Sequence, residues 1–143
     1  MAPTKNLIPT PELRAELESL ATIVFKPKGT TLFRRGGAVS GVFLIRSGRV
    51  SLGLDYETRV YPARILGPGA IVGLPATVSG SPYSLTAKAV DDSELAFVPR
   101  KAVVARLKNN PVLCFQVMDM LSGEIAGIRA AFKQNNSICR AEV

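Results

Sequence analysis

Short β-type runs separated by glycine, proline and aspartate fill the chain between Ala21 and Pro99. β-branched and aromatic residues make up these runs, among them GVFLIR, RVSLGL and SELAFVP. Turn-forming pairs such as Ser47-Gly48 and Asp91-Asp92 separate them. Many short strands at close spacing are typical of a β-sandwich, a barrel or a jelly roll. The region therefore predicts a mainly β fold of the jelly-roll kind, a β-roll over residues 21–99.

Two local structures are expected inside this region. The stretch VFLIRSGRVSL has two apolar runs joined by Ser47-Gly48, which predicts a hairpin with that pair as its turn. Pro62 lies inside the run RVYPARIL, and proline cannot donate a hydrogen bond to a neighbouring strand. That run is therefore expected at a sheet edge or at a bulge.

Helical patterns flank the β region. Thr10-Pro11-Glu12 combines a hydroxyl N-cap, a proline at the first helical position and an acid at the positive end of the dipole, which predicts a helix over 11–20. RKAVVARLKNN predicts a helix over 100–109 that stops before Pro111. Asn110 is expected to cap a further helix over 111–133.

The helix over 111–133 carries one long apolar stripe. Its members recur at spacings of three and four: Leu113, Val117, Met120, Leu121, Ile125, Ile128 and Phe132. Two interpretations stay open: the stripe lies back on its own β-roll, or it pairs with a second copy of the chain. We take the second as our working hypothesis, a homodimer through this helix. All 143 residues are expected to form one domain, 1–143.

The chain has no histidine, and this excludes several kinds of catalytic site. Ser-His-Asp triads, Cys-His dyads and zinc or haem sites that use histidine are impossible. The two cysteines, Cys114 and Cys139, form neither a disulfide framework nor a Cys-x-x-Cys motif, which suits a reducing cytoplasm. We expect no catalytic residue, no metal and no cofactor. No apolar run approaches the roughly 20 residues of a membrane-spanning helix, and no secretory signal is visible.

The formal net charge of +7 raises nucleic acid as a partner. The basic residues are scattered, however, and no run of five or six like charges occurs. A solvated basic surface is therefore the favoured interpretation.

The order and spacing of several pieces resemble the cyclic-nucleotide-binding domain, the sensor half of catabolite-activator and Fnr-type (Crp/Fnr) regulators. The matching pieces are F-x-x-G near Phe33–Gly37, FLIRSGRVSL, ILGPGAIVG, AKAVDDSELAFVPR and NPVL. The resemblance implies a jelly roll flanked by helices, with the last helix commonly making a parallel dimer. In DNA-binding relatives a helix-turn-helix domain follows. Here about ten residues remain after Phe132, so we expect no nucleic-acid reading head; a stand-alone sensor and a fragment of a longer regulator both stay open.

The resemblance assigns GLPATVSGSPYS, Gly73–Ser84, to the place of the family's phosphate-binding cassette; we call it the cassette segment. The family's pattern there is Gly-Glu-Leu or Gly-Glu-Ile, a helical turn, and then an arginine followed by a small residue. Exposed amides hold the cyclic phosphate, the arginine neutralises it, and the glutamate accepts from the ribose hydroxyl. In this chain Gly73 matches, but Leu74 stands for the glutamate, Ser84 for the arginine and Leu85 for the small residue. The base-contacting positions of the last helix correspond to Ile128 and Arg129, which do not match the usual threonine–serine pair.

The cassette is therefore expected to be degenerate, a pocket with altered chemistry. Candidate ligand-binding residues are Gly73, Leu74, Pro75, Ala76, Tyr83, Ser84, Leu85 and Lys88. They suit an uncharged or weakly polar small molecule, or no ligand. The alternative is a genuine cyclic AMP or cyclic GMP domain that uses a substitute base. Lys88, at an even offset from Ser84 on a strand, or an arginine among Arg46, Arg49, Arg59 and Arg64 are the candidates.

Overall fold

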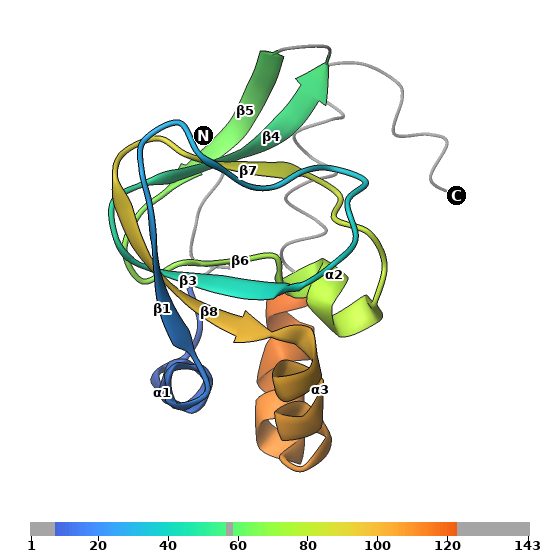
Figure 1. Ribbon diagram of the computed structural model, residues 1–143. Coiled ribbons are helices and arrows are strands. Elements are labelled where there is room, and N and C mark those ends of the chain that lie inside the picture. Colours follow the sequence, from blue (N-terminus) through green and yellow to red (C-terminus); the bar gives the residue numbers. More distant parts are fainter. Residues whose placement is uncertain (1–7, 57–58, 123–143) are drawn as a thin grey trace.

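Two antiparallel four-stranded sheets make up the body of the molecule (Figure 1). The computed structural model describes residues 8–56 and 59–122, with side chains outside residues 55–63. One sheet has the order β1-β8-β3-β6 and the other β2-β7-β4-β5. The elements are α1 (Pro11–Ser19), β1 (Thr22–Lys26), β2 (Thr31–Phe33), β3 (Gly41–Ser47), β4 (Val50–Tyr56), β5 (Arg59–Leu66), β6 (Ile71–Val72), α2 (Leu74–Ser79), β7 (Thr86–Ala89), β8 (Ser93–Pro99) and α3 (Arg100–Lys108), followed by helical residues 111–122. The predicted mainly β class with flanking helices is confirmed.

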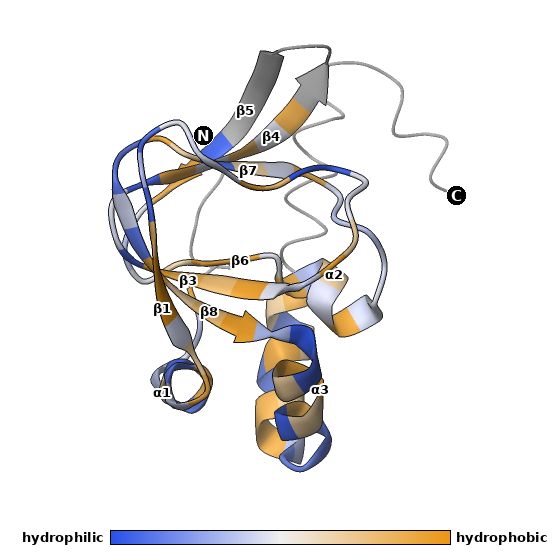
Figure 2. Ribbon diagram, viewed as in Figure 1, coloured by the Kyte–Doolittle hydropathy of each residue, from blue (hydrophilic) through white to orange (hydrophobic). Residues whose placement is uncertain are grey.

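The sheet β1-β8-β3-β6 is covered on both faces. On β3, Phe43 and Ile45 belong to an apolar cluster between the two sheets, whereas Val42 and Leu44 belong to a second cluster beneath the helices. Strand β3 is consequently buried without interruption from Gly41 to Ile45, as expected for a strand with apolar neighbours on either side. Figure 2 shows β3 and β8 as hydrophobic strands in the middle of the molecule.

Helix α1 begins as the sequence predicted. Thr10 Oγ1 accepts a hydrogen bond from the Leu13 amide at 3.2 Å and donates to Oε1 of Gln116 at 2.5 Å. An ion pair of 2.7 Å between Glu16 and Arg106 joins α1 to α3. These contacts link α1 to both C-terminal helical segments, although about a hundred residues of chain separate them.

The helical residues 111–122 follow α3 after a short break. Oδ1 of Asn110 accepts from the Leu113 amide at 3.2 Å, which confirms the predicted cap. The part of the predicted helix beyond residue 122 lies outside the described residues.

The predicted hairpin at Ser47-Gly48 is wrong. Strand β3 pairs with β6 and β8, whereas β4 pairs with β5 and β7, so the turn carries the chain from one sheet to the other. Gly48 has a φ of +88°, and a Cβ there would lie 2.2 Å from the Ser93 hydroxyl oxygen and 2.6 Å from the Asp92 carbonyl oxygen. The close packing of this corner against the β7–β8 turn explains the glycine.

The expectation for Pro62 is confirmed. Strand β5 is the edge strand of its sheet, and its register with β4 shifts between Leu52 and Gly53, which pair with Arg64 and Pro62. An edge position and a bulge both remove the need for an amide donor at the proline.

Candidate functional site

The cassette segment forms helix α2 and the loop that follows it, at one end of the β-roll (Figure 1). Gly73 and Gly80 flank α2 with φ angles of +88° and +78°, a left-handed conformation that favours glycine. A Cβ on Gly73 would lie 3.0 Å from the carbonyl oxygen of Gly41 and 3.3 Å from Cε1 of Tyr83. Glycine at position 73 therefore serves both the backbone conformation and the close packing of the site.

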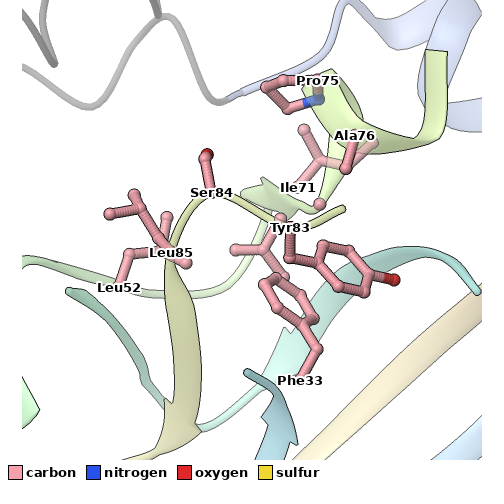
Figure 3. A pocket seen from close by; sticks show the side chains of 10 residues that line it. Phe33, Leu52, Ile71, Pro75, Ala76, Tyr83, Ser84 and Leu85 are labelled. Carbon is pink, nitrogen blue, oxygen red and sulfur yellow. The ribbon is translucent and has the colours of Figure 1, made fainter. Parts of the chain in front are cut away.

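A small apolar pocket lies between α2 and the two sheets (Figure 3). It encloses about 30 Å³, room for one or two water molecules. Its walls come from β2, β4, β6, α2 with its N-cap Gly73, and the loop before β7: Phe33, Leu52, Ile71, Val72, Gly73, Pro75, Ala76, Tyr83, Ser84 and Leu85. The candidate site residues did not include the first four of these: Phe33 and Leu52 lie on strands far from the cassette in the chain, and Ile71 and Val72 lie on the strand directly before it. The motif pieces F-x-x-G, FLIRSGRVSL and ILGPGAIVG contain these four residues, and were the signal that could have found them.

Tyr83 is a buried aromatic residue in the wall of this pocket. Its side chain is 3% exposed, and its ring stacks on Phe33 with the centroids 3.8 Å apart and the planes at 11°. The tyrosine hydroxyl lies within hydrogen-bond distance of Ser40 and Gly41 at the start of β3. The pocket is thus narrow because the chain's own aromatic rings fill it.

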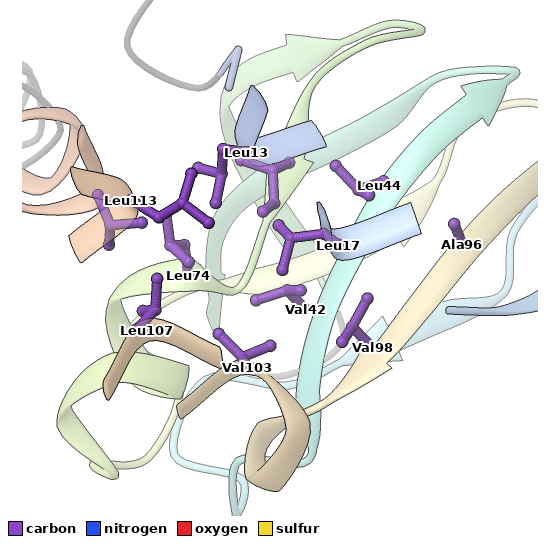
Figure 4. Close-up of a cluster of buried hydrophobic side chains, with 12 residues drawn as sticks. Leu13, Leu17, Val42, Leu44, Leu74, Ala96, Val98, Val103, Leu107 and Leu113 are labelled. Atoms are coloured by element: carbon purple, nitrogen blue, oxygen red, sulfur yellow. The ribbon is translucent and has the colours of Figure 1, made fainter. Parts of the chain in front are cut away.

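Leu74 does not line the pocket, contrary to the sequence prediction. It is 3% exposed and belongs to the apolar cluster beneath the helices, with Leu13, Leu107 and Leu113 (Figure 4). Since α2 lies across the end of the roll, successive residues of its first turn face different environments: Pro75 and Ala76 reach the pocket, and Leu74 faces the helices.

Lys88 is the other predicted site residue that does not reach the pocket. Its neighbours on β7, Ala87 and Ala89, are buried, and Ala87 belongs to the cluster between the sheets. Because side chains alternate along a strand, Lys88 points to the outer face of its sheet. It pairs across the strands with Ser51, whose neighbours Val50 and Leu52 face inward.

Charged side chains near the β3–β4 corner are engaged with one another at the surface. Arg46 lies 2.9 Å from Glu94 and 3.6 Å from Glu18. Arg49 donates to Asp91 at 2.6 Å, and this hydrogen bond holds the pKa of the Asp91 carboxyl below its ordinary value. Neither arginine lines the pocket.

Arg64 is a buried basic residue. It is 6% exposed, lies two residues before the interior Leu66 on β5, and pairs with the pocket residue Leu52. The even offset from Leu66 turns Arg64 toward the space between the sheets. The sequence analysis named several strand arginines as candidates but did not predict which face of the sheet each one occupies. In the structure Arg64 is buried, whereas Arg46 and Arg49 lie at the surface. The side chain of Arg59 lies outside the described residues.

The predicted dimer stripe is divided between two environments. Leu113 and Val117, which are 3% and 1% exposed, belong to the chain's own core, and Met120 and Leu121 pack partly against it. The prediction that these two residues meet a second copy is therefore wrong, because their own chain already covers them. Ile125, Ile128 and Phe132 lie outside the described residues.

A different apolar row is exposed on the same helix. Val112, Phe115 and Met118, spaced by three, are 65%, 76% and 58% exposed. We call them the exposed row. Side chains at this spacing lie along one side of a helix.

The described residues contain no group of three or more metal-binding side chains, and no described helix could cross a membrane. The site consists instead of an apolar pocket with a short helix at its rim.

Two sheets that enclose such a pocket, with helices packed on one of them, define a β-roll domain. The solved catabolite activator protein of Thermus thermophilus is similar, with a TM-score of 0.74 and 21% identity over 87% of this chain and 59% of that one. The sensor domain of the transcriptional regulator DNR from Pseudomonas aeruginosa gives a TM-score of 0.66 and 24% identity over 81% and 79%.

A family model described as "Cyclic nucleotide-binding domain" matches residues 23–110. The chain belongs to the cyclic nucleotide-binding domain family, and its relatives include regulators of the Crp/Fnr type, as the motif order predicted. One of them, the anaerobic regulatory protein of Bacillus subtilis (strain 168), is 28% identical over 133 residues. The match covers 92% of this chain and 56% of that protein, so the chain spans little more than half of this relative's length.

Proposed function

We propose that the domain is a non-catalytic sensor or regulatory module of the cytoplasm whose phosphate cassette is degenerate. Its family consists of binding domains, and its relatives include regulators. We further propose that it signals through the helix that begins after Asn110, by pairing with a second copy. The exposed row supports this pairing, because aligned apolar side chains at 58–76% exposure are typical of an interaction surface.

The single observation that carries the degenerate-cassette proposal is the composition of the pocket wall. Every lining side chain is uncharged, and the space is about 30 Å³, against roughly 300–1,000 Å³ for pockets that hold drug-sized ligands. Ser84, at the position of the family's arginine, supplies no positive charge to a phosphate. Charge-assisted hydrogen bonds of this kind contribute about 1.5–3 kcal/mol each.

We expect cyclic AMP and cyclic GMP to bind weakly or not at all. Calorimetric titration with each nucleotide should give a dissociation constant weaker than about 10 μM, equivalent to roughly −7 kcal/mol. A thermal-shift assay with the same nucleotides provides an independent measurement. Tighter binding of either nucleotide would disprove the degenerate cassette.

A second candidate is genuine nucleotide binding with a substitute base, and the burial of Arg64 favours it. An arginine held between the sheets, beside the pocket residue Leu52, is better situated for a phosphate than Lys88 on the outer face. If this candidate is correct, Arg64→Met should weaken cyclic nucleotide binding by at least about tenfold, whereas Lys88→Ala should leave it unchanged. Equal effects of the two substitutions would remove Arg64 as the phosphate ligand.

A further inference from the structure

The ring of Tyr83 is held in the site as a bound aromatic molecule would be. Parallel stacking on Phe33 at 3.8 Å covers one of its faces, and Gly73 approaches its edge so closely that a Cβ would lie 3.3 Å from Cε1. The backbone of Tyr83 is fixed as well, because its amide donates to Gly37 and its carbonyl accepts from Gly36. The ring is therefore fixed from several sides.

The hydroxyl of Tyr83 connects the site to the start of β3. It accepts from the Ser40 amide at 3.0 Å and the Gly41 amide at 3.2 Å, and it donates to the Gly41 carbonyl at 2.9 Å. It also lies 3.1 Å from the hydroxyl of Ser40. A phenol has one donor and two acceptor positions, so the first three contacts satisfy it completely.

The same segment of β3 connects onward to helix α3. The carbonyl of Ser40 accepts from the Arg100 amide at 2.9 Å, at the first residue of α3. The Arg100 side chain returns to the cassette segment, where its Nε donates to the Thr77 carbonyl at 2.9 Å. The cassette segment, residues 40–41 and the first turn of α3 thus form a closed loop of hydrogen bonds.

We propose that Tyr83 is a built-in occupant of the pocket and that its hydroxyl couples the pocket to α3. The ring fills the space that a ligand would need, and the hydrogen bonds through Ser40 hold the first turn of α3 in position. The domain is thereby kept in one conformation without an external ligand. This rests on the proposed function in one respect: after a short break, α3 is followed by the helix that carries the exposed row.

Amide hydrogen exchange on the whole chain tests the coupling. Tyr83→Phe keeps the ring and its stack on Phe33 but removes the hydroxyl. We expect the amides of Gly41 and Arg100 to exchange about tenfold faster or more, since one lost buried hydrogen bond contributes about that factor. Ser81→Ala, at an exposed position of the same loop outside the pocket wall, is the matched control and should change neither amide. Unchanged exchange at Arg100, or an equal acceleration of every slow amide, would overturn the proposal.

Replacing the ring of Tyr83 by a small molecule tests the other part of the proposal, that Tyr83 is a built-in occupant of the pocket. Tyr83→Ala retains Cβ and leaves a space of the shape of the ring and its hydroxyl, and phenol is that group as a free molecule. Adding phenol should restore slow exchange at Arg100 in this variant, whereas benzene, which lacks the hydroxyl, should not; the wild type should respond to neither. Equal rescue by both molecules, or no rescue of a folded variant, would refute the built-in occupant. If Tyr83→Ala does not fold, the Tyr83→Phe result decides. Neither experiment involves a nucleotide or a second copy, so its failure is distinguishable from failure of the proposed function.

Discussion

Replacing Phe115 by glutamate is expected to convert a dimer into a folded monomer. Phe115 is 76% exposed, so the single chain loses little when this side chain becomes charged. In the proposed dimer, the same position would hold a buried aromatic side chain, and a carboxylate there would be desolvated without a partner. We expect dimer affinity to fall by about 3 kcal/mol or more, which is over a hundredfold.

Analytical ultracentrifugation measures this directly, as a fall in mass to that of one 15.3 kDa chain. The matched control is Ala105→Glu, which adds the same charge at an exposed position of α3 outside the exposed row. It should leave the dimer intact. A wild-type chain that is monomeric, or a Phe115→Glu variant that remains dimeric, would contradict pairing through the exposed row.

Restoring the family's glutamate by Leu74→Glu is expected to destabilise the domain severely. The Leu74 side chain is 3% exposed in an apolar cluster with Leu17, Val103 and Leu107. A carboxylate at this position would be buried among apolar side chains, so the free energy of unfolding should fall by roughly 3–5 kcal/mol. The whole free energy of unfolding of a typical domain is about 5–15 kcal/mol. Denaturant unfolding at neutral pH measures the loss.

The pH dependence of this loss has a defined sign. Burial would raise the folded-state pKa of the new glutamate above its unfolded value of about 4.3. The deficit should therefore be greatest above the folded-state pKa and should shrink as the pH falls through it toward about pH 4. Leu74→Met, a volume-conserving control, should cost less than about 1.5 kcal/mol at every pH. A Leu74→Glu variant as stable as the wild type would show that position 74 has access to water.

Local sequence signals predicted the elements of the fold well. Thr10 and Asn110 cap helices because a side-chain oxygen three residues before an amide satisfies it whatever lies elsewhere. Pro62 indicated an edge or a bulge because a missing amide is a property of that residue alone. Gly73 was identified as a cassette glycine, and its positive φ agrees with the turn required there.

Signals that depend on a partner elsewhere in the chain were less informative. Ser47-Gly48 suits a hairpin and a corner between sheets equally, and the choice depends on β6, β7 and β8, which come later in the sequence. Leu74 and Pro75 are adjacent and both apolar, yet one faces the helices and the other the pocket. Hydrophobicity alone does not say which apolar surface a residue will meet.

The sequence by itself determined the mainly β class, the flanking helices and a cassette segment that contains neither an acid nor a base. These follow from backbone preferences and side-chain chemistry, which each residue carries with it. The tertiary structure alone decided that Tyr83 is buried in the pocket wall, that Arg64 is buried, and that Val117 is covered while Phe115 is exposed. Those outcomes depend on packing between segments far apart in the chain, because the neighbours that bury a side chain are set by the assembled sheets and helices.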